Sequence, residues 1–323
     1  MDIKGISLAI VRGIYDSFKG TLVLFYLDKE INERARNRHS PSIKQKHTEV
    51  DNRLLQKQQK KQNESNVFHN VLQCALLNGG FFLFSVLLFE YLLFPGIDVL
   101  FNTVFGAGSV TNIWIWIKYF LLVIYGTVWI LPLILLSKII NTLWFQDIAD
   151  SAYRYSRGRP VSFPSISMYF ADSIFSIMVQ ILFLAQATLT SFIPIFPLGY
   201  LIYIIQMSLL HALYSFEYKW FNMGWELHKR LSFIEENWPY FLGFGLPLTI
   251  LTQLSESWVI NGCVFSIVFP LFIISGNEAN PIINKSNINL HLFSLVITTA
   301  NVVFSTMGKS KKLGVVSSGK ISK

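Results

Sequence analysis

The sequence predicts an all-α integral membrane protein with two full transmembrane helices, two membrane-inserted helical hairpins and amphipathic interfacial helices. Hydrophobic residues make up 52% of the 323 residues and charged residues only 14%, whereas a soluble domain is about one quarter charged. The chain also contains apolar stretches long enough to cross a bilayer, separated by polar and basic connectors. It therefore lacks the polar surface that a water-soluble core of this size needs.

Residues 1–27 have the pattern of an amphipathic helix. Apolar residues recur at helical spacing from Ile10 to Phe25, whereas Arg12, Asp16 and Lys19 lie on another face. Such a helix either lies in the membrane interface or packs against other helices of the same protein, and the pattern leaves both open. The charges interrupt the segment too often for a cleaved signal peptide.

Residues 28–66 form a basic, polar segment with ten Lys or Arg against six Asp or Glu. This composition predicts a solvated segment that is largely disordered or loosely helical. It can contact anionic lipid headgroups or an acidic protein partner. An ordinary cytoplasmic loop of a membrane protein has the same pattern, and that interpretation stays open as well.

Two uncharged stretches of 19 residues each, 71–89 and 119–137, predict the two full transmembrane helices, because a crossing helix needs about 20 apolar residues. The connection between them contains Pro95 and several glycines, which predicts a turn. Pro132 is expected to kink the second helix.

The two later apolar blocks predict hairpins. Residues 173–216 carry no formal charge over 44 residues, about twice the length of one crossing. Pro194 and Pro197 break this stretch near its middle. The block 241–277 is shorter and is interrupted by Glu256, so a hairpin that enters the bilayer and returns is expected there. The lengths leave open whether either hairpin crosses fully.

The distribution of Lys and Arg predicts the orientation in the membrane. The segment 28–66, the connectors between apolar blocks and the basic tail 308–323 favour the cytoplasm, while the loop 90–112 has no Lys or Arg. Both termini are therefore expected in the cytoplasm. The multi-pass membrane domain is expected to span residues 67–307.

No catalytic pattern is present in the sequence. It contains no HExxH, Walker A, GxSxG or CxxC motif, and its histidines are scattered. We therefore expect a protein that is not an enzyme, with no catalytic residue, no metal and no cofactor. Cys74 and Cys263 lie in apolar runs and are expected to be small buried hydrophobes. His211 is expected to be a hydrogen-bonded packing residue.

Four acidic residues were candidates for a role in or beside the membrane. Glu256 either lines a polar pathway or marks a hairpin tip, and the flanking serines favour the tip. Asp172 is expected at the cytoplasmic start of its helix, where an acid suits the N-terminus. Asp147 and Asp150 can share a helix face, but a solvated interfacial helix explains that spacing better than an ion site.

Long motifs in the connectors resemble the etoposide-induced protein 2.4 family. They are NTLWFQDIAD at 141–150, FEYKWFN at 216–222 and RLSFIEENWPY at 230–240, and the resemblance runs in order over roughly residues 8–300. The motifs contain residues to which no role is assigned. These are Trp144, Phe145, Gln146, Asp147, Asp150, Glu217, Trp220, Asn237, Trp238, Pro239 and Glu278.

The resemblance implies a multi-pass membrane protein of the endoplasmic reticulum, extending to the nuclear membrane, that is required for autophagy when autophagosomes mature to degradative autolysosomes. It also implies a link to p53-induced apoptosis and growth suppression, and binding of a Bcl-2-like protein and of importin-β. The lipid bilayer is an expected partner, and nucleic acid is not. An oligomer is compatible with the sequence. Importin or lipid contacts would map to Arg34, Arg36, Arg38, Lys44, Lys46, Lys57, Lys60 and Lys61.

The family is also distantly similar to the bacterial CysZ sulfate permeases. That similarity implies two full transmembrane helices and two partial hairpins, in agreement with the apolar blocks. It makes a transporter or channel for a small, sulfate-like anion or for lipid the alternative function. The ends of hairpin helices inside a membrane can bind anions, which is the physical basis of this alternative.

Overall fold

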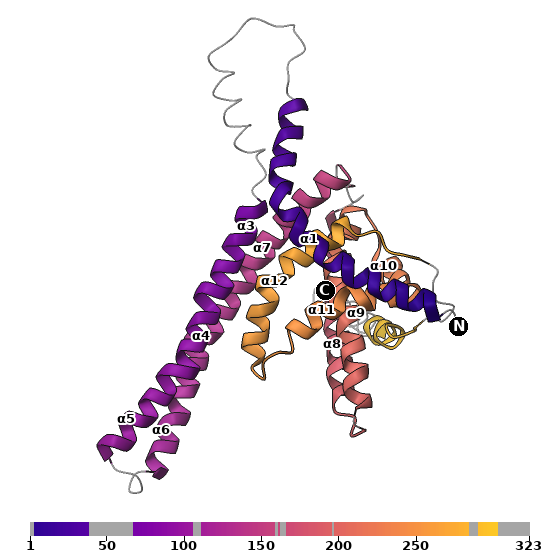
Figure 1. Cartoon of the computed structure of the whole chain (residues 1–323). Coiled ribbons are helices and arrows are strands. Elements are labelled where there is room, and N and C mark those ends of the chain that lie inside the picture. Colours follow the sequence, from indigo (N-terminus) through magenta and orange to yellow (C-terminus); the bar gives the residue numbers. More distant parts are fainter. Residues whose placement is uncertain are drawn as a thin grey trace, which may run out of the picture. The chain divides into compact units, whose positions relative to one another are not determined.

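The computed structural model describes residues 3–38, 67–105, 111–158, 161, 166–195, 197–283 and 290–302 (Figure 1). The secondary-structure elements within these ranges are helices, which confirms the predicted all-α class. Five of the helices described are long and apolar enough to cross a membrane. They are Val67–Val104, Trp116–Arg154, Ala171–Ser191, Leu198–Asn222 and Trp258–Glu278.

The chain divides into two compact units. Unit 1 comprises residues 1–19, 159–249 and 275–323, and unit 2 comprises residues 20–158 and 250–274. Three helices contribute residues to both units, namely α1 (Ile3–Arg38), α11 (Trp238–Leu251) and α12 (Trp258–Glu278).

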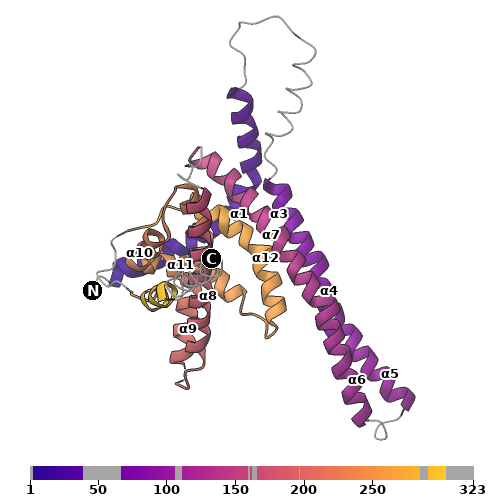
Figure 2. The ribbon, with the colours of Figure 1, turned by 180° about the vertical axis from the view of Figure 1, so that it is seen from behind.

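Unit 2 is built on a long helical hairpin whose two arms run side by side (Figures 1 and 2). The first arm consists of α3 (Val67–Ala75), η1 (Leu76–Leu83), α4 (Phe84–Leu88), η2 (Phe89–Leu93) and α5 (Phe94–Phe105). The second arm consists of α6 (Thr111–Ile124), η3 (Tyr125–Ile130) and α7 (Leu131–Ser156). The η segments are π-helical, so each arm is a continuous helix with locally wider turns.

Both arms are longer than the sequence predicted. The turn expected over residues 90–112 is corrected, because residues 90–105 and 111–112 are helical and only 106–110 lie outside the described residues. Pro95 and Pro132 do not end their arms, and each is the second residue of the α-helix that follows a π-helical segment. Such a segment re-satisfies the backbone groups that a proline leaves without their usual α-helical partner.

Helix α1 continues past the predicted boundary at residue 27 to Arg38, so residues 28–38 follow the helical one of the two expectations for this segment. Residues 39–66 lie outside the described residues. The sequence has Glu30 four residues before Arg34, a spacing that favours a helix without any apolar face. An apolar pattern alone could not detect this extension.

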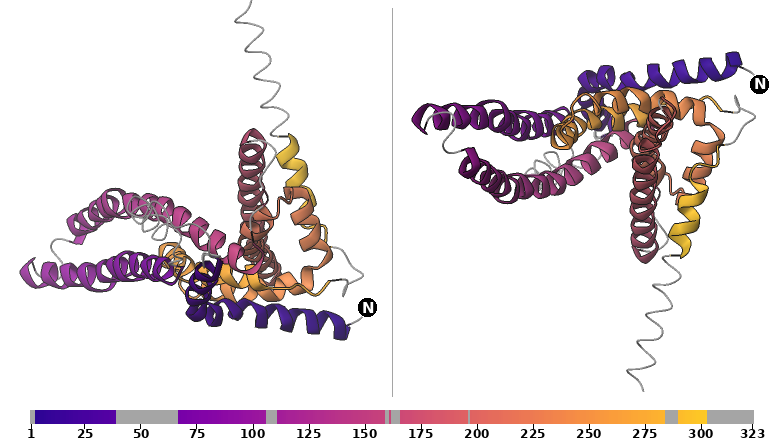
Figure 3. Two further views of the ribbon diagram at one scale, coloured as in Figure 1. Left: turned by 90° about the horizontal axis from the view of Figure 1, so that it is seen from above. Right: turned by 90° about the horizontal axis from the view of Figure 1, so that it is seen from below.

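Unit 1 contains the hairpin of α8 (Ile166–Ser191) and α9 (Leu198–Asn222), with the break found at the expected prolines. Unit 1 also contains helix α10 (Leu227–Glu236), the part of α11 up to Thr249, a short helical segment at 294–302, the start of α1 and the end of α12. Figure 3 shows the yellow segment 294–302 beside α8, where Phe293 stacks on Phe183 with 4.3 Å between ring centroids. The core is aromatic: Phe216 and Phe241 are both buried, and their ring centroids are 5.1 Å apart.

Glycines allow helix backbones to touch in unit 1. A Cβ at Gly245 of α11 would overlap the carbonyl oxygen of Ser208 in α9, and one at Gly243 would overlap that of Ile10 in α1. Small residues permit this close approach between apolar helices. Helix α1 therefore packs against α11, while its opposite face leaves Val11 and Phe18 exposed. One apolar face of α1 packs within the protein, as one of the two interpretations expects. The opposite face is also apolar but exposed, as the interfacial interpretation expects.

The third apolar block is divided where the sequence predicts. Helix α11 ends at Leu251 and α12 begins at Trp258, and Glu256 lies exposed in the connecting turn. Helix α11 is apolar but shorter than the five helices that can cross a membrane, whereas α12 is long enough. The two helices of this block therefore differ in their capacity to span a bilayer.

Candidate functional site

A cluster of amide and hydroxyl side chains joins the two arms of the long hairpin in unit 2. Asn78 Nδ2 donates to Asn141 Oδ1 at 2.8 Å, and Ser137 Oγ donates to Asn78 Oδ1 at 2.7 Å. Asn141 Nδ2 donates to Ser137 Oγ at 2.9 Å and to Asn78 Oδ1 at 3.1 Å. Both asparagines are buried. Hydrogen bonds of this kind hold apolar helices in one register.

The same cluster reaches α12. Cys74 Sγ lies 3.4 Å from Asn141 Oδ1 and donates to the carbonyl oxygen of Ser266 at 3.2 Å. The ring of Phe145 in α7 contacts that of Phe269 in α12, with 5.2 Å between centroids. Three helical segments of unit 2 are therefore tied together around Asn78, which belongs to the π-helical segment η1.

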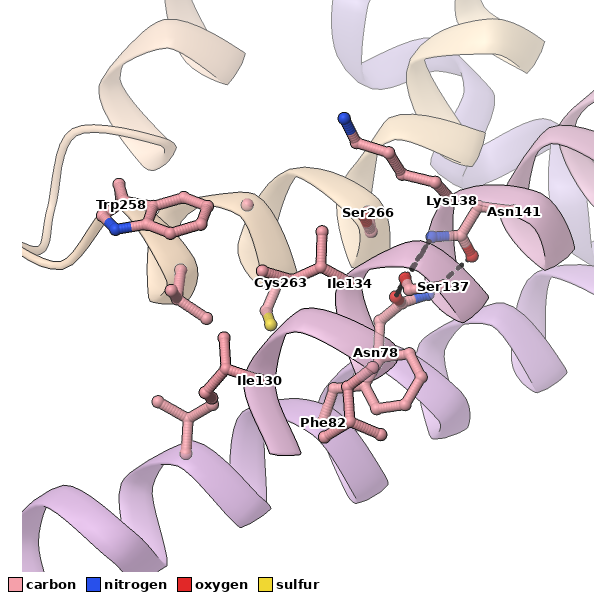
Figure 4. Close-up of a pocket in the computed structure, with 14 residues that line it drawn as sticks. Asn78, Phe82, Ile130, Ile134, Ser137, Lys138, Asn141, Trp258, Cys263 and Ser266 are labelled. Carbon is pink, nitrogen blue, oxygen red and sulfur yellow. Dashed lines mark hydrogen bonds between the residues drawn. The ribbon is translucent and has the colours of Figure 1, made fainter. Parts of the chain in front are cut away.

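A cavity of about 300 Å³ lies next to this cluster (Figure 4). Side chains such as Phe82 and Ile130 make most of its wall apolar, and the amide cluster forms a polar end. Lys138 and Trp258 belong to the lining but are exposed, so they lie at the rim. The full lining is Asn78, Phe82, Val86, Ile130, Leu133, Ile134, Ser137, Lys138, Asn141, Trp258, Val259, Gly262, Cys263 and Ser266.

A second polar site, in unit 1, surrounds the guanidinium of Arg230. The side chain of Arg230 is only 1% exposed and contacts Asp172 Oδ2 at 2.8 Å and Glu217 Oε1 at 3.5 Å. Its Nε donates to the carbonyl oxygen of Trp225 at 2.8 Å. One cation from α10 is thus shared between a carboxylate of α8 and a carboxylate of α9. A buried charge is tolerated only with such partners.

Further hydrogen bonds complete this ion cluster. Ser176 Oγ and Gln180 Nε2, both from α8, donate to the Glu217 carboxylate. Asp172 Oδ1 accepts the N–H of Leu227, the first residue of α10, at 3.2 Å. Asp172 was expected at the start of its own helix. It lies inside α8, which begins at Ile166, and caps the N-terminus of α10 instead.

Lys219 is a buried cation that caps a helix end in unit 1. Its Nζ donates to the carbonyl oxygens of Gly276 at 3.1 Å and Ala279 at 2.7 Å, where α12 terminates. A cation is favourable at a helix C-terminus because the last carbonyl groups lack backbone partners. The FEYKWFN motif therefore supplies one residue to the ion cluster and one to a helix cap.

The model of the family described as "Sulfate transporter CysZ/Etoposide-induced protein 2.4" matches residues 62–255. The chain belongs to this family. It is 34% identical over 155 residues to Ectopic P granules protein 4 of Caenorhabditis elegans, a match that covers 48% of this chain and 49% of that protein. The chain thus spans about half the length of that relative. No solved structure matches it.

Two further relatives are each named Protein EI24 homolog. The one from Arabidopsis thaliana is 27% identical over 239 residues, covering 65% of this chain and 74% of the relative. The one from Dictyostelium discoideum is 27% identical over 248 residues, covering 75% of this chain and 77% of the relative. The protein is therefore a multi-pass membrane protein of the EI24 family.

Several family-motif residues have structural roles. Trp220 stacks on Trp225, with 5.8 Å between ring centroids, in the aromatic core of unit 1. Asn237 ends α10 and donates its side-chain amide to the carbonyl oxygen of Phe233 at 3.0 Å, and Pro239 is buried in the first turn of α11. Trp238 is partly buried where α11 begins. The Asn-Trp-Pro sequence is therefore a junction between two helices.

The residues of the NTLWFQDIAD motif in α7 do not gather at one site. Phe145 is buried and Trp144 partly buried, whereas Gln146 donates to Asp150 Oδ1 at 3.0 Å and Asp147 is exposed. In the part of the chain that the structure describes, no group of three His, Cys, Asp or Glu side chains could hold a metal ion.

The remaining candidates lie at helix ends. Glu278 is the last residue of α12 and accepts from Asn277 Nδ2 at 3.4 Å. Arg34, Arg36 and Arg38 belong to the last turns of α1. The candidate lysines beyond α1 lie outside the described residues. They are Lys44, Lys46, Lys57, Lys60 and Lys61.

The expectations for the two cysteines and for His211 agree with the structure, and Glu235 makes a contact that the sequence did not indicate. Cys74 and Cys263 are free and buried, and Cys74 is hydrogen-bonded as well. His211 Nδ1 lies 2.9 Å from Thr249 Oγ1 in a buried contact between α9 and α11. Glu235, outside the spans, accepts the N–H of Phe293 at 2.8 Å. Partial burial raises the pKa of the Glu235 carboxyl, although this hydrogen bond acts in the opposite direction.

Sequence reasoning missed the role of Arg230 and of the amide cluster. Arg230 appears in the sequence analysis only as the first residue of a motif, and Asn78 is not singled out there. A usable signal was present, because Asn78 is a polar residue inside an uncharged transmembrane stretch. Polar groups at such positions are costly unless they find a partner on a neighbouring helix.

Proposed function

We propose that the protein is a non-enzymatic membrane protein of the endoplasmic reticulum required for autophagy, at the maturation of autophagosomes to degradative autolysosomes. Family membership carries this proposal. The matched region 62–255 contains the whole long hairpin, the α8–α9 hairpin and both polar sites. A link to p53-induced apoptosis and growth suppression belongs to the same proposal.

The chemistry of the two polar sites supports a non-catalytic role. The amides of Asn78 and Asn141 bond to each other, and Arg230 is surrounded by its own carboxylate and carbonyl partners. Groups arranged in this way fix the positions of helices. We infer that the protein acts by organising membrane or by binding partners through the surfaces that this framework presents.

Loss and restoration of autophagic degradation test the proposal. Cells that lack the protein should accumulate undegraded autophagosomes, and re-expression of the full chain should restore degradation. Glu256→Gln is the matched control, since Glu256 is an exposed turn residue with no tie to either polar site, and it should restore degradation fully. Normal degradation in the deficient cells would contradict the proposal.

The orientation proposed from the basic connectors has a separate test. With both termini in the cytoplasm, the natural Asn-x-Ser sites at Asn63 and Asn284 carry no glycan. An acceptor site inserted between residues 106 and 110 should be glycosylated, because this loop faces the opposite side. A change in the gel mobility of the natural chain after glycosidase treatment would contradict this orientation. So would an unchanged mobility of the chain that carries the inserted acceptor site.

The family resemblance also proposes a Bcl-2-like partner and importin-β. Replacing the ten Lys and Arg of residues 28–66 with Gln tests the importin role, because importin binding by a basic segment depends on its charge. This variant should lose importin-β binding in a pull-down while the membrane domain stays folded. Unchanged binding would exclude this segment as the importin site.

A transporter for a small anion is the second candidate function. The observation that favours it is the cavity between membrane helices, in a family whose description includes a sulfate transporter. Purified protein in liposomes would then increase the flux of sulfate over protein-free liposomes. Equal flux would remove this candidate, and a changed rate in Glu256→Gln would place Glu256 on the pathway.

A further inference from the structure

The cavity of unit 2 has an apolar interior and a charged rim. Its volume of about 300 Å³ is at the lower end of the range for pockets that hold small ligands, roughly 300–1,000 Å³. Phe82, Ile130 and Leu133 belong to its apolar wall, whereas Lys138 is exposed at its rim. Figure 4 shows the Lys138 amine pointing away from the amide cluster and the Cys263 sulfur pointing between α12 and the hairpin.

The charges of the second arm place this rim at a membrane surface. Lys118 and Lys138 are 20 residues apart on one continuous helix, which corresponds to about 30 Å, the thickness of the hydrocarbon core. Lys118 forms an ion pair with Asp98 at 3.1 Å near the far end of the hairpin. Lys138 therefore lies near the opposite headgroup layer, and the apolar wall of the cavity extends from there toward the bilayer interior.

The two lysines differ in their partners. Lys118 has the carboxylate of Asp98, but no carboxylate pairs with Lys138 among the residues that the structure describes. The neighbouring amide cluster does not supply one, since Asn78, Ser137 and Asn141 are neutral and bond to one another. The rim thus offers a cation to an anion from outside the chain.

We propose that this cavity binds one acyl chain of a glycerophospholipid whose phosphate contacts Lys138. The phosphate supplies the missing anion, and the acyl chain fills an apolar space between three helices. Free phosphate or sulfate shares the oxyanion chemistry but not the chain. A free oxyanion would meet a single cation and a largely apolar wall, which leaves its oxygens without donors. This site does not depend on the proposed role in autophagy.

Gly262 offers a way to fill the cavity without disturbing the fold. It lines the cavity, and a Cβ built there meets no atom within 4 Å. Gly262→Phe should therefore fold and occupy the space of the acyl chain. Gly80→Phe is the matched control, because Gly80 is equally open but does not line the cavity. Lys138→Gln removes the rim charge, and Lys118→Gln removes a cation elsewhere on the same arm.

The test measures binding to the purified full chain in detergent micelles by native mass spectrometry. The probes are dioleoyl phosphatidic acid, dioleoylglycerol with the same chains and no phosphate, and inorganic phosphate alone. Phosphatidic acid should bind at least about tenfold more tightly than dioleoylglycerol, as expected for one charge-assisted hydrogen bond. Inorganic phosphate alone should neither bind nor compete.

The variants separate the two parts of the site. Lys138→Gln should lower the affinity for phosphatidic acid about tenfold, and Gly262→Phe should abolish binding of both lipids, while both control variants bind as the natural chain does. Equal binding of phosphatidic acid by Gly262→Phe and the natural chain would overturn the proposal. So would an unchanged affinity in Lys138→Gln, or inorganic phosphate that competes as well as the lipid.

Discussion

The long hairpin of unit 2 and the α8–α9 hairpin of unit 1 are both pairs of apolar helices, but they are covered differently. In the most apolar 18-residue stretch of Trp116–Arg154, with a mean hydropathy of 2.3, no residue is buried within the protein. In Leu198–Asn222, with a mean hydropathy of 1.3, 56% are buried. The more apolar helix is thus the more exposed one, the reverse of a soluble protein. We infer that lipid covers most of the second arm of the long hairpin, whereas protein covers more than half of this stretch of α9.

The polar groups follow the same division. Helix α9 buries His211 and Lys219, each with a partner on another helix of unit 1. In the long hairpin, Ser137 and Asn141 of the second arm bond to Asn78 of the first arm, and Trp129 Nε1 donates to Ser85 Oγ at 2.6 Å. In both hairpins these polar side chains therefore find partners on a neighbouring helix.

The largest expected effect comes from removing the central cation of unit 1. Arg230→Gln leaves two carboxylates in a buried site, which typically costs about 3–5 kcal/mol of folding free energy. Thermal unfolding in detergent measures the loss. Lys118→Gln, which breaks the more exposed pair with Asp98 in unit 2, should cost less than about 1 kcal/mol. Similar losses of unfolding free energy in Arg230→Gln and Lys118→Gln would contradict the view that the ion cluster of unit 1 is buried by protein while the ion pair of unit 2 is not.

Glycine replacements distinguish close protein packing from a lipid-covered surface. Gly245→Ala forces a methyl group against the Ser208 carbonyl and should cost about 1–3 kcal/mol. Gly126→Ala, on the second arm, meets no atom within 4 Å and should raise helix stability by up to about 1 kcal/mol. Unfolding temperatures of the two variants should move in opposite directions. A shift in the same direction would mean that both helices are packed alike.

The amide cluster should show strong coupling between its members. Asn78→Leu leaves Asn141 without its main partner and should cost about 1–2 kcal/mol. The double variant Asn78→Leu with Asn141→Leu removes both partners, so it should cost less than the sum of the single variants. A double-mutant cycle of unfolding free energies measures this coupling. Additive losses would show that the two amides do not act as a pair.

The smallest effect is expected at the hairpin tip. Glu256 is exposed in the turn between α11 and α12, and Glu256→Gln should change the unfolding free energy by no more than about 0.5 kcal/mol. The same thermal unfolding assay measures it. A loss comparable to that of Arg230→Gln would reveal a buried role for Glu256 that its exposure does not suggest.

The sequence predicted the features that depend on local composition. The breaks at Pro194, Pro197 and Glu256 were identified because prolines and a charge interrupt apolar stretches there. The end of α1 was misplaced because residues 28–38 are helical without being apolar. Pro95 was interpreted as a turn because a one-dimensional pattern cannot show the π-helical segment that accommodates it.

The candidate sites were harder to predict because they join distant parts of the chain. Asp172 and Arg230 are 58 residues apart, and Asn78 and Asn141 are 63 apart. Each of these residues has an ordinary interpretation when taken alone, such as a helix cap or a polar residue in a connector. Only the pairing of helices shows that they bond to each other.

Labelling from within the bilayer tests the contrast between the two hairpins most directly. The full chain in phosphatidylcholine vesicles would be exposed to a small apolar carbene precursor that partitions among the acyl chains, and labelled residues would be located by mass spectrometry. The account predicts dense labelling on the middle of Trp116–Arg154 and sparse labelling on the buried half of Leu198–Asn222. Equal labelling of the two helices would contradict it.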